Sequence, residues 1–373
     1  MLAGALAGNL AANGHDVEML TTCAVDHYTW KNELPPGPEQ MGHLLVRRFP
    51  ADARDLGIFI ELEHAIAEGL PLSIEEQHVW LRNQVSSSAM EDFLADEGKA
   101  YDLILPIPYL FGTSYFAYRA RPERVVPIPC LHDEAYAYLP CIKEMLEGSR
   151  GVMFNAAAEA RLAHKIAPGL QNPAVVGMGF EPPGEVTPEG FRKKYGLTSP
   201  FLLYLGRREG GKNVPLLIDY FMRYKGRRAG DLTLAFVGKG DVQLPDREDI
   251  VELELDWNDR DSMYAAATAF CQPSINESFS IVIMQAWLAS CPVLVHARCE
   301  VTREHCGDSN GGLWFGNYAE FEDVLDRLVS DERLRLALGR NGSRYVRTKY
   351  SWQAVTERVN QAIQQWAGAG AVA

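Results

Sequence analysis

The stretch Ser274-Ile-Asn-Glu277-Ser-Phe-Ser280-Ile-Val-Ile-Met-Gln285 joins a predicted strand to a predicted helix. The apolar run Ala269–Gln272 before it predicts a buried strand, and an apolar helical pattern begins near Ser280. The first N–H groups of a helix are unpaired and carry positive dipole charge, so such a loop suits a phosphate group. Upstream, a second apolar strand ends at Gly206-Arg207, and Lys212 follows. Two cations and a helix N-terminus, each after a strand, predict a diphosphate site.

Several segments of this chain follow one another in the order found in retaining glycosyltransferases of family 4, which have the GT-B fold. From about Leu202 to Trp352 the chain resembles that family closely, and before Leu202 more loosely. The closer matches are Gly206-Arg207 with Lys212, Phe236-Val237-Gly238-Lys239-Gly240, Pro273-Ser274 with Glu277-Ser278-Phe279-Ser280, Asn310-Gly311-Gly312-Leu313 and Tyr350-Ser351-Trp352. The looser matches are Gly14-His15-Asp16-Val17, Leu131-His132-Asp133 and Phe154-Asn155. The resemblance implies an α/β protein with two Rossmann-like domains whose parallel sheets face each other across a cleft.

The resemblance also implies roles for single residues. Arg207 and Lys212 would bind the diphosphate of a nucleotide-diphospho-sugar, Glu277 would contact the sugar hydroxyls, and His132 would face the donor sugar at the reaction centre. Further donor contacts are expected from Gly206, Gly238, Ser278, Phe279, Ser280, Ile281 and Gln285. Each role has a plainer alternative: a solvated surface pair for the two cations, a helix-capping acid for Glu277, and a structural histidine for His132.

Gln285 departs from the family, which has a second, ribose-binding glutamate at this position. A carboxylate accepts hydrogen bonds from both ribose hydroxyls, whereas an amide accepts one and donates one. Gln285 therefore indicates either an altered ribose contact, a changed donor or a site that has lost activity.

The predicted activity is transfer of a sugar, with retention, from a UDP-, GDP-, ADP- or TDP-sugar to a small-molecule, glycan or lipid-linked acceptor. We expect no obligatory cofactor and no metal, because Arg207 and Lys212 would neutralise the leaving diphosphate. The sequence offers no evident pair of catalytic carboxylates, which a front-face mechanism does not need. Two alternatives stay open: a nucleotide-sugar epimerase or phosphorylase, and a non-catalytic nucleotide-sugar-binding or partner protein of the same fold.

Two groups of residues resemble metal sites superficially. Asp259-Arg260-Asp261 has the Asp-x-Asp pattern, but it lies directly before the predicted helix Met263–Thr268 and is expected to cap it. Cys299, His305 and Cys306 fit no standard zinc spacing. We therefore expect no metal site.

Composition limits the class of protein. The chain has 373 residues, a formal net charge of -13 and 47% hydrophobic residues, which favours two soluble domains and argues against a nucleic-acid partner. No apolar run reaches the roughly 18–20 residues of a membrane span. The start, Met1 to Ala12, lacks the basic region of a signal peptide. Seven cysteines without a Cys-x-x-Cys pair favour the cytoplasm, and peripheral attachment to a membrane stays open.

Alternating strand and helix patterns predict an N-terminal, acceptor-side domain over 1–180 and a nucleotide-sugar domain over 181–351, joined by a hinge at 179–184. The C-terminal helix, 352–373, is expected to pack back on the first domain. In the first half we predict a helix over 2–12, helical stretches over 58–95 that include 74–94, and strands over 15–21, 47–49, 101–107, 124–131, 151–155 and 174–178. In the second half we predict strands over 201–205, 232–237, 250–253, 269–272 and 293–295 and helices over 188–195, 261–268, 281–289, 319–329, 331–346 and 352–366.

In the family, a strand and a glycine-rich turn precede the helix that corresponds to Leu2–Ala12. This sequence has neither. A doubly wound sheet without that central strand would leave backbone groups unpaired, so we expect the native chain to extend N-terminal to Met1. A shorter, altered sheet is the alternative.

Overall fold

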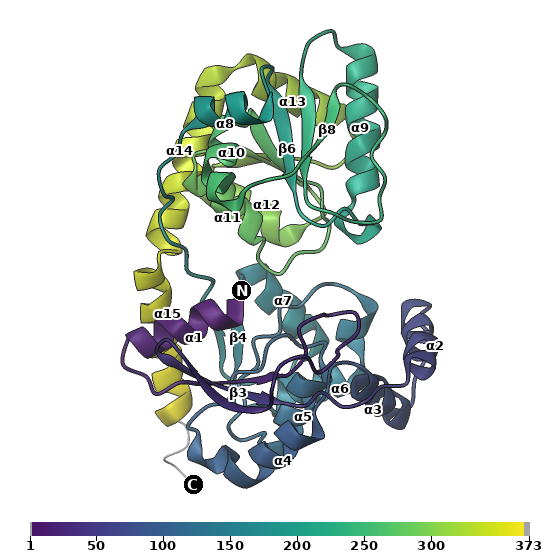
Figure 1. Cartoon of the computed structure of the whole chain (residues 1–373), viewed down its shortest axis with the longest axis vertical. Helices are drawn as coiled ribbons and strands as arrows, with labels where there is room; N and C mark the ends of the chain where they lie inside the picture. Colours follow the sequence, from purple (N-terminus) through teal and green to yellow (C-terminus); the bar gives the residue numbers. More distant parts are fainter. Residues whose placement is uncertain (1, 369–373) are drawn as a thin grey trace. The chain divides into compact units, whose positions relative to one another are not determined.

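The computed structural model describes residues 2–368 and divides into two units, which Figure 1 shows. Unit 1 comprises Met1–Gly179 and Val355–Ala373, and unit 2 comprises Phe180–Ala354. Residues 181–187, which follow the boundary, form neither helix nor strand. Proline and glycine in this segment, at Pro182, Pro183 and Gly184, disfavour both kinds of element.

Unit 2 is built on one six-stranded sheet in the order β11-β10-β9-β6-β7-β8, and every neighbouring pair is parallel. Its strands are β6 (Phe201–Leu205), β7 (Thr233–Val237), β8 (Ile250–Leu253), β9 (Ala269–Gln272), β10 (Val293–His296) and β11 (Gly312–Phe315). Its helices are α8 (Pro188–Tyr195), η3 (Gly210–Lys212), α9 (Val214–Arg227), η4 (Trp257–Asp259), α10 (Arg260–Ala266), α11 (Ile281–Leu288), α12 (Glu300–Ser309), α13 (Tyr318–Ser330) and α14 (Glu332–Lys349). This is the doubly wound order of a Rossmann-like domain.

Helices cover both faces of this sheet. Along β6 every residue is buried, as a strand buried on both faces requires. Leu202 and Tyr204 join the core that α9 and α13 share with the sheet, so the alternate residues of β6 face the other way. On that other side, Phe201 lies against Phe191 of α8, with ring centroids 6.4 Å apart.

Glycines let α14 approach the rest of unit 2 closely. A Cβ atom added to Gly339 would lie 1.9 Å from the Ser290 carbonyl oxygen, and one on Gly342 would lie 2.1 Å from Trp287 Cδ1. Trp287 is fully buried and its indole N–H donates to the Gly311 carbonyl oxygen at 2.8 Å. The Asn310–Leu313 segment singled out in the sequence thus serves packing of α11, α14 and β11.

Unit 1 contains smaller sheets and more helix. Its strands are β1 (Glu18–Thr22), β2 (Gly37–Met41), β3 (Leu44–Phe49), β4 (Val152–Phe154) and β5 (Pro173–Val175). They form a sheet in the order β1-β3-β2, with β1 parallel and β2 antiparallel to β3, and a parallel pair β4-β5. Its helices are α1 (Leu2–Ala12), α2 (Leu56–Ala67), α3 (Ile74–Asn83), α4 (Ser88–Glu97), η1 (Gly98–Ala100), α5 (Gly112–Ala120), η2 (Ala135–Tyr138), α6 (Pro140–Gly148), α7 (Ala157–Ile166) and most of α15 (Trp352–Gly368).

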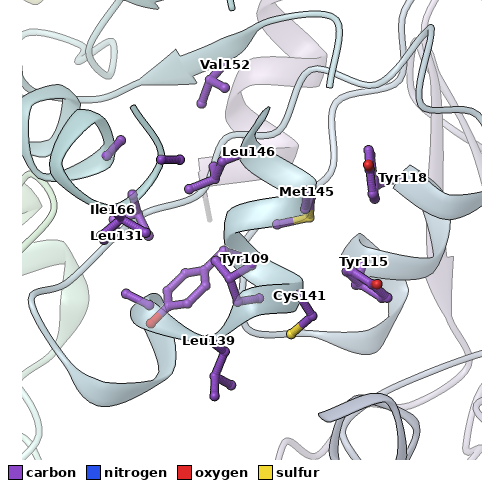
Figure 2. Packing of buried hydrophobic residues seen from close by; sticks show 14 of the residues in the cluster. Tyr109, Tyr115, Tyr118, Leu131, Leu139, Cys141, Met145, Leu146, Val152 and Ile166 are labelled. Atoms are coloured by element: carbon purple, nitrogen blue, oxygen red, sulfur yellow. The ribbon is translucent and has the colours of Figure 1, made fainter. Parts of the chain in front are cut away.

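The core of unit 1 gathers around α6, as Figure 2 shows. Tyr109, Tyr115 and Leu131 pack there with Met145 and Leu146, and each of these side chains is at most 1% exposed.

None of the described helices, which span residues 2–368, is long and apolar enough to cross a membrane.

Two sequence predictions for unit 1 are wrong in detail. The helical stretches predicted over 58–95, one of them over 74–94, are three helices, because Gly69 adopts a φ of 71° and Ser73 and Ser87 start new helices with side-chain caps. The strands predicted over 101–107 and 124–131 are extended segments with one β-bridge, Ile104 to Val125, and a further backbone bond from the Ile128 N–H to the Pro106 carbonyl oxygen at 2.9 Å. Pro106, Pro108, Pro127 and Pro129 lack the N–H groups that a continuous ladder needs.

Candidate functional site

The predicted site residues of unit 2 lie at the carboxyl ends of two neighbouring strands. β6 and β9 are paired, but the chain proceeds from β6 toward β7 on one side and from β9 toward β10 on the other. This is the topological switch point of the sheet, where open α/β sheets bind ligands. The loop after β6 carries Gly206, Arg207 and Lys212, and the loop after β9 carries Glu277.

Glycines interlock the loops that follow β6 and β7. Gly206 has a φ of 154° and Gly238 a φ of 112°, and a Cβ atom on Gly238 would lie 2.4 Å from the Gly206 carbonyl oxygen. A Cβ atom on Gly240 would lie 2.2 Å from the Arg208 carbonyl oxygen. Gly206 and Gly238 therefore shape the backbone here, and a side chain at Gly238 would separate the two loops.

The two adjacent arginines have different tasks. Arg208 is buried: its guanidinium donates to the Gly238 carbonyl oxygen at 2.9 Å and to Glu252 Oε1 at 2.7 Å, which ties the β6, β7 and β8 ends together. The Arg207 side chain is 62% exposed and pairs with Glu209 at 2.7 Å. The Tyr204 hydroxyl donates to the Arg207 carbonyl oxygen at 2.7 Å, so the backbone of Arg207 is fixed while its guanidinium remains available.

Lys212 and Glu277 form an ion pair that links the two loops. Lys212 Nζ lies 2.9 Å from Glu277 Oε1, and their side chains are 25% and 11% exposed. Gln272 Nε2, at the end of β9, donates to the same oxygen at 3.0 Å. Next to Lys212, Asn213 donates from Nδ2 to the Pro273 carbonyl oxygen at 3.0 Å. The contacts fix Lys212 and Glu277 at the switch point.

The segment after β9 carries polar groups without partners. The side chains of Gln272, Ser274 and Ser280 are at least 95% buried, yet Gln272 Oε1, Ser274 Oγ and Ser280 Oγ have no hydrogen-bond partner among the described residues. Ser280 precedes α11 with a φ of 71° and makes no side-chain cap. Across the described residues, we find no hydrogen bond donated by the backbone N–H groups of 278–281. Buried polar groups normally have partners, so this segment is suited to an external acceptor or anion.

Phe279 fixes the segment after β9 through buried aromatic contacts. It is 1% exposed and lies between Phe180, Tyr350 and His305, with ring centroids 6.1, 5.1 and 5.2 Å away. Its side chain therefore packs inside unit 2, which leaves its backbone for binding. Burial lowers the pKa of His305 to about 3, and its Nδ1 pairs with the Tyr345 hydroxyl at 2.9 Å.

Gln285 is the fifth residue of α11 and lies beside α10. Its Oε1 accepts from the Tyr264 hydroxyl at 3.5 Å, a long contact, and Tyr264 is fully buried. Burial also holds the pKa of Tyr264 far above its usual value, so the phenol stays a donor. Among the described residues, the amide N–H₂ of Gln285 makes no hydrogen bond.

His132 belongs to unit 1, in the turn after the extended segment that carries Val125. Its Nδ1 lies 3.7 Å from Glu134 Oε1, and the Tyr109 hydroxyl donates to that oxygen at 2.7 Å. Tyr109 is 1% exposed and burial raises its pKa strongly, so it remains a donor that orients Glu134. Sequence reasoning did not find Tyr109, because its partner is 25 residues away.

The Asp-x-Asp segment is not a helix cap. Asp259 makes no side-chain cap at the start of α10; it instead accepts from Lys194 at 2.5 Å and from the Tyr195 hydroxyl at 2.9 Å, both on or at the end of α8. The capping prediction is therefore wrong. Within residues 2–368, no group of three or more His, Cys, Asp or Glu side chains could hold a metal ion. Cys299 and Cys306 are buried free thiols.

Gln272 and Asn213 are the site residues that sequence reasoning missed in unit 2. Gln272 is the last residue of a strand directly before a functional loop, and Asn213 directly follows Lys212 with a left-handed φ of 58°. Gln272 could have been chosen from the sequence, since strand ends at a switch point supply ligands. The hydrogen bonds of the two residues to Glu277 and Pro273, however, depend on the fold.

Comparison with known proteins finds a family model that matches within unit 2. Residues 189–345 match the family model of glycosyl transferases group 1. A D-inositol 3-phosphate glycosyltransferase from Corynebacterium jeikeium is 31% identical over 109 residues, which are 29% of this chain and 26% of that protein. An N-acetylgalactosamine-N,N'-diacetylbacillosaminyl-diphospho-undecaprenol 4-alpha-N-acetylgalactosaminyltransferase from Campylobacter jejuni is 30% identical over 152 residues, 38% of this chain and 40% of that protein. The matches thus span less than half the length of these curated relatives.

Solved structures show the fold of the whole chain. Sucrose-phosphate synthase from Thermosynechococcus elongatus superposes with a TM-score of 0.72 at 18% identity and covers 98% of this chain and 92% of that one. A structure described as trehalose-6-phosphate from E. coli bound with UDP-2-fluoro glucose gives a TM-score of 0.72 at 13% identity, with 97% and 96% covered. The chain has the GT-B fold, as the sequence predicted.

Proposed function

We propose that this protein is a retaining, metal-independent glycosyltransferase of family 4 that uses a nucleotide-diphospho-sugar. The observation that carries the proposal is the switch point of unit 2. There an exposed arginine, a fixed Lys212–Glu277 pair and a segment of unpaired N–H and hydroxyl groups lie on the two loops that follow β6 and β9. We assign unit 2 as the donor-binding domain, and unit 1 with most of α15 as the acceptor-side domain.

In this proposal each polar group has a task. Arg207 and Lys212 bind the two phosphates, the backbone N–H groups of Ser278–Ile281 contact the distal phosphate, and Glu277 accepts from sugar hydroxyls. Gln285 contacts the ribose through its amide, and His132 is the residue of unit 1 that we assign to the reaction centre. Gly206 and Gly238 keep the loops close enough for the diphosphate to approach the backbone.

The reaction balances without a metal or a protein nucleophile. The bond between the anomeric carbon and the diphosphate oxygen breaks, and a bond to the acceptor oxygen forms on the same face of the sugar. The acceptor proton passes to the departing phosphate oxygen, and negative charge grows on the diphosphate. Fixed cations and N–H donors at that position stabilise the transition state more than the ground state.

A nucleotide screen tests the proposal. UDP, GDP, ADP and TDP, each alone and as its glucose conjugate, are added to the protein, and the unfolding temperature is measured. A ligand at 100 times its Kd adds about 2.7 kcal/mol of stability. We expect stabilisation by one nucleotide, followed by transfer of its sugar with retained anomeric configuration, measured by NMR of the product. No stabilisation by any of them would contradict the proposal.

Arg207→Ala then separates binding from folding. It should lower kcat/KM by about 2–4 kcal/mol of transition-state stabilisation with an unchanged unfolding temperature. The matched control is Arg223→Ala on α9, because the Arg223 side chain is 51% exposed and also pairs with a carboxylate, Asp219, at 3.7 Å. If the two variants have equal activity, Arg207 does not bind the donor.

One observation favours a second candidate, a non-catalytic nucleotide-sugar-binding protein. Gln285 replaces the carboxylate expected at the ribose, and its Oε1 already contacts Tyr264. A protein of this kind would show nucleotide stabilisation in the same screen without sugar transfer and without hydrolysis of the donor.

A further inference from the structure

Glu159 is a buried carboxylate in unit 1 that the proposed reaction does not use. It is the third residue of α7, and its side chain is 1% exposed. Its Oε2 accepts from the Asn155 N–H at 2.7 Å and its Oε1 from the Leu131 N–H at 2.8 Å. Burial raises its pKa to about 7, while the N–H donors of Asn155, Leu131 and Ala156 oppose that rise.

Helix capping explains only half of this arrangement. A glutamate at the third position of a helix often accepts an N–H from the residues that precede the helix, as Oε2 does here. The bond from Leu131 has no such local cause, because Leu131 is 28 residues away in the chain. One carboxylate therefore joins the end of β4 to the turn that begins at Leu131.

His132 is the next residue in the chain after Leu131, whose N–H makes this bond. Leu131 itself is fixed on its other side, since its side chain is 1% exposed and packs in the core of unit 1, as Figure 2 shows. Directly before it, Cys130 has a φ of 55°, a left-handed conformation that a non-glycine residue holds only when its surroundings fix it. Asn155 Nδ2 donates to Cys130 Sγ at 3.5 Å.

A second anchor lies after His132. The Glu134 carboxylate accepts from the Tyr109 hydroxyl at 2.7 Å, and the Glu134 carbonyl oxygen accepts from the Ala137 N–H at 3.0 Å. The backbone of His132 is therefore held between the bond at Leu131 and the bonds at Glu134. Among the contacts described for the first of these anchors, Glu159 supplies the carboxylate and Cys130 the thiol that accepts from Asn155 Nδ2.

We propose that Glu159 is a positioning residue for His132, because its carboxylate fixes the Leu131 N–H against Asn155 and so sets where the imidazole lies. The proposal rests on the proposed function in one respect: His132 acts on the donor sugar or the acceptor. The positioning itself does not depend on which sugar is transferred.

Glu159→Gln tests it, since an amide keeps the size but turns one acceptor into a donor that faces an N–H. We expect kcat to fall about 10- to 100-fold, because a shift of about 1 Å at a reacting group has effects of this size. The Kd of the nucleotide diphosphate, bound by unit 2, should change less than twofold. In the NMR spectrum, the His132 ring resonances and their titration midpoint should shift.

The matched control is Glu147→Gln. Glu147 also accepts a backbone N–H in the same unit, that of Gly169 at 3.0 Å. This variant should leave kcat and the His132 resonances unchanged. If Glu159→Gln does not fold, Glu159→Asp takes its place, and its single remaining bond should give the same direction of change.

A double-mutant cycle separates positioning from general damage. In the His132→Ala background, Glu159→Gln should cost little further activity, whereas a merely structural role would lower kcat by the same factor in both backgrounds. His132 resonances unchanged in Glu159→Gln would overturn the positioning. If those resonances shift but His132→Ala leaves kcat unaltered, the proposed role of His132 fails instead.

Discussion

The Lys212–Glu277 pair allows the structural and the ligand-binding roles of a site to be separated by three variants. The atoms lie 2.9 Å apart. At an effective dielectric constant of about 20, charges at that distance attract by about 6 kcal/mol before desolvation is subtracted. Removing one partner of a fully buried pair costs about 3–5 kcal/mol. Since 25% of the Lys212 side chain is exposed, we expect Lys212→Met to lower the free energy of unfolding by about 2–3 kcal/mol.

When Glu277→Gln is added to Lys212→Met, most of the lost free energy of unfolding should return. The double variant has no unpaired carboxylate, and the neutral amide can still accept from Gln272 Nε2. We therefore expect its stability to return to within about 1 kcal/mol of the wild type. Nucleotide binding should not return, because a charged hydrogen bond to phosphate contributes about 1.5–3 kcal/mol, which is about 10- to 150-fold in Kd.

The measurements are urea unfolding for stability and calorimetric titration with whichever of UDP, GDP, ADP or TDP stabilises the wild type. Arg327→Met is the control, because Arg327 and Asp323 form an exposed pair in the same unit, 66% and 63% accessible. It should change neither quantity measurably. If the double variant binds the nucleotide as tightly as the wild type, Lys212 supports the fold alone and the diphosphate lies elsewhere.

The sequence predicts unit 2 far better than unit 1. β6, β8 and β9 begin and end at the predicted residues, because parallel strands covered on both faces appear as continuous apolar runs between polar loops. In unit 1 the apolar runs around Ile104 and Val125 contain prolines. The backbone still pairs there, with the Ile104 N–H donating to the Arg124 carbonyl oxygen at 2.9 Å, but the ladder is interrupted.

The helical stretches predicted over 58–95 included 74–94 as one stretch, so only the start at Ile74 was given among the internal boundaries. Gly69-Leu70-Pro71 ends a helix, and Ser73 with Glu76 forms a capping box that starts another. These are local patterns, so closer attention to stop and start residues would have found the end of the first helix as well, and Ser87, which caps α4, marks the start of the third.

The site divides in the same way between local and distant information. Arg207, Lys212 and Glu277 could be chosen because each lies in a loop after a predicted strand. The ion pair between Lys212 and Glu277 joins residues 65 positions apart, and so does the contact between Lys194 and Asp259 that overturns the capping prediction. Such pairings follow from strand order, which the sequence pattern alone does not give.

Three further predictions address the metal, the ribose and a buried histidine. Transfer activity should persist in excess EDTA, and complete loss that magnesium restores would overturn the assignment of the charge-neutralising role to Arg207 and Lys212. Gln285→Glu should keep or raise activity, whereas Gln285→Leu should weaken nucleotide binding by about 1–3 kcal/mol, measured by titration. If both variants keep the nucleotide affinity of the wild type, the ribose does not lie at Gln285. The last concerns His305, which burial keeps neutral with a pKa of about 3 against an ordinary value of 6.5. Below pH 6.5 His305 takes up a proton in the unfolded chain but not in the folded unit 2. The free energy of unfolding therefore falls as the pH falls from 6.5 toward 3. At pH 4.5 this amounts to about 3 kcal/mol. His305→Phe keeps an aromatic ring beside Phe279 and removes the titration, so its urea-unfolding free energy should approach or exceed that of the wild type as the pH falls from 7 to 4.5. A difference between the two proteins that stays constant over this range would show that His305 takes up its proton equally in the folded and unfolded states.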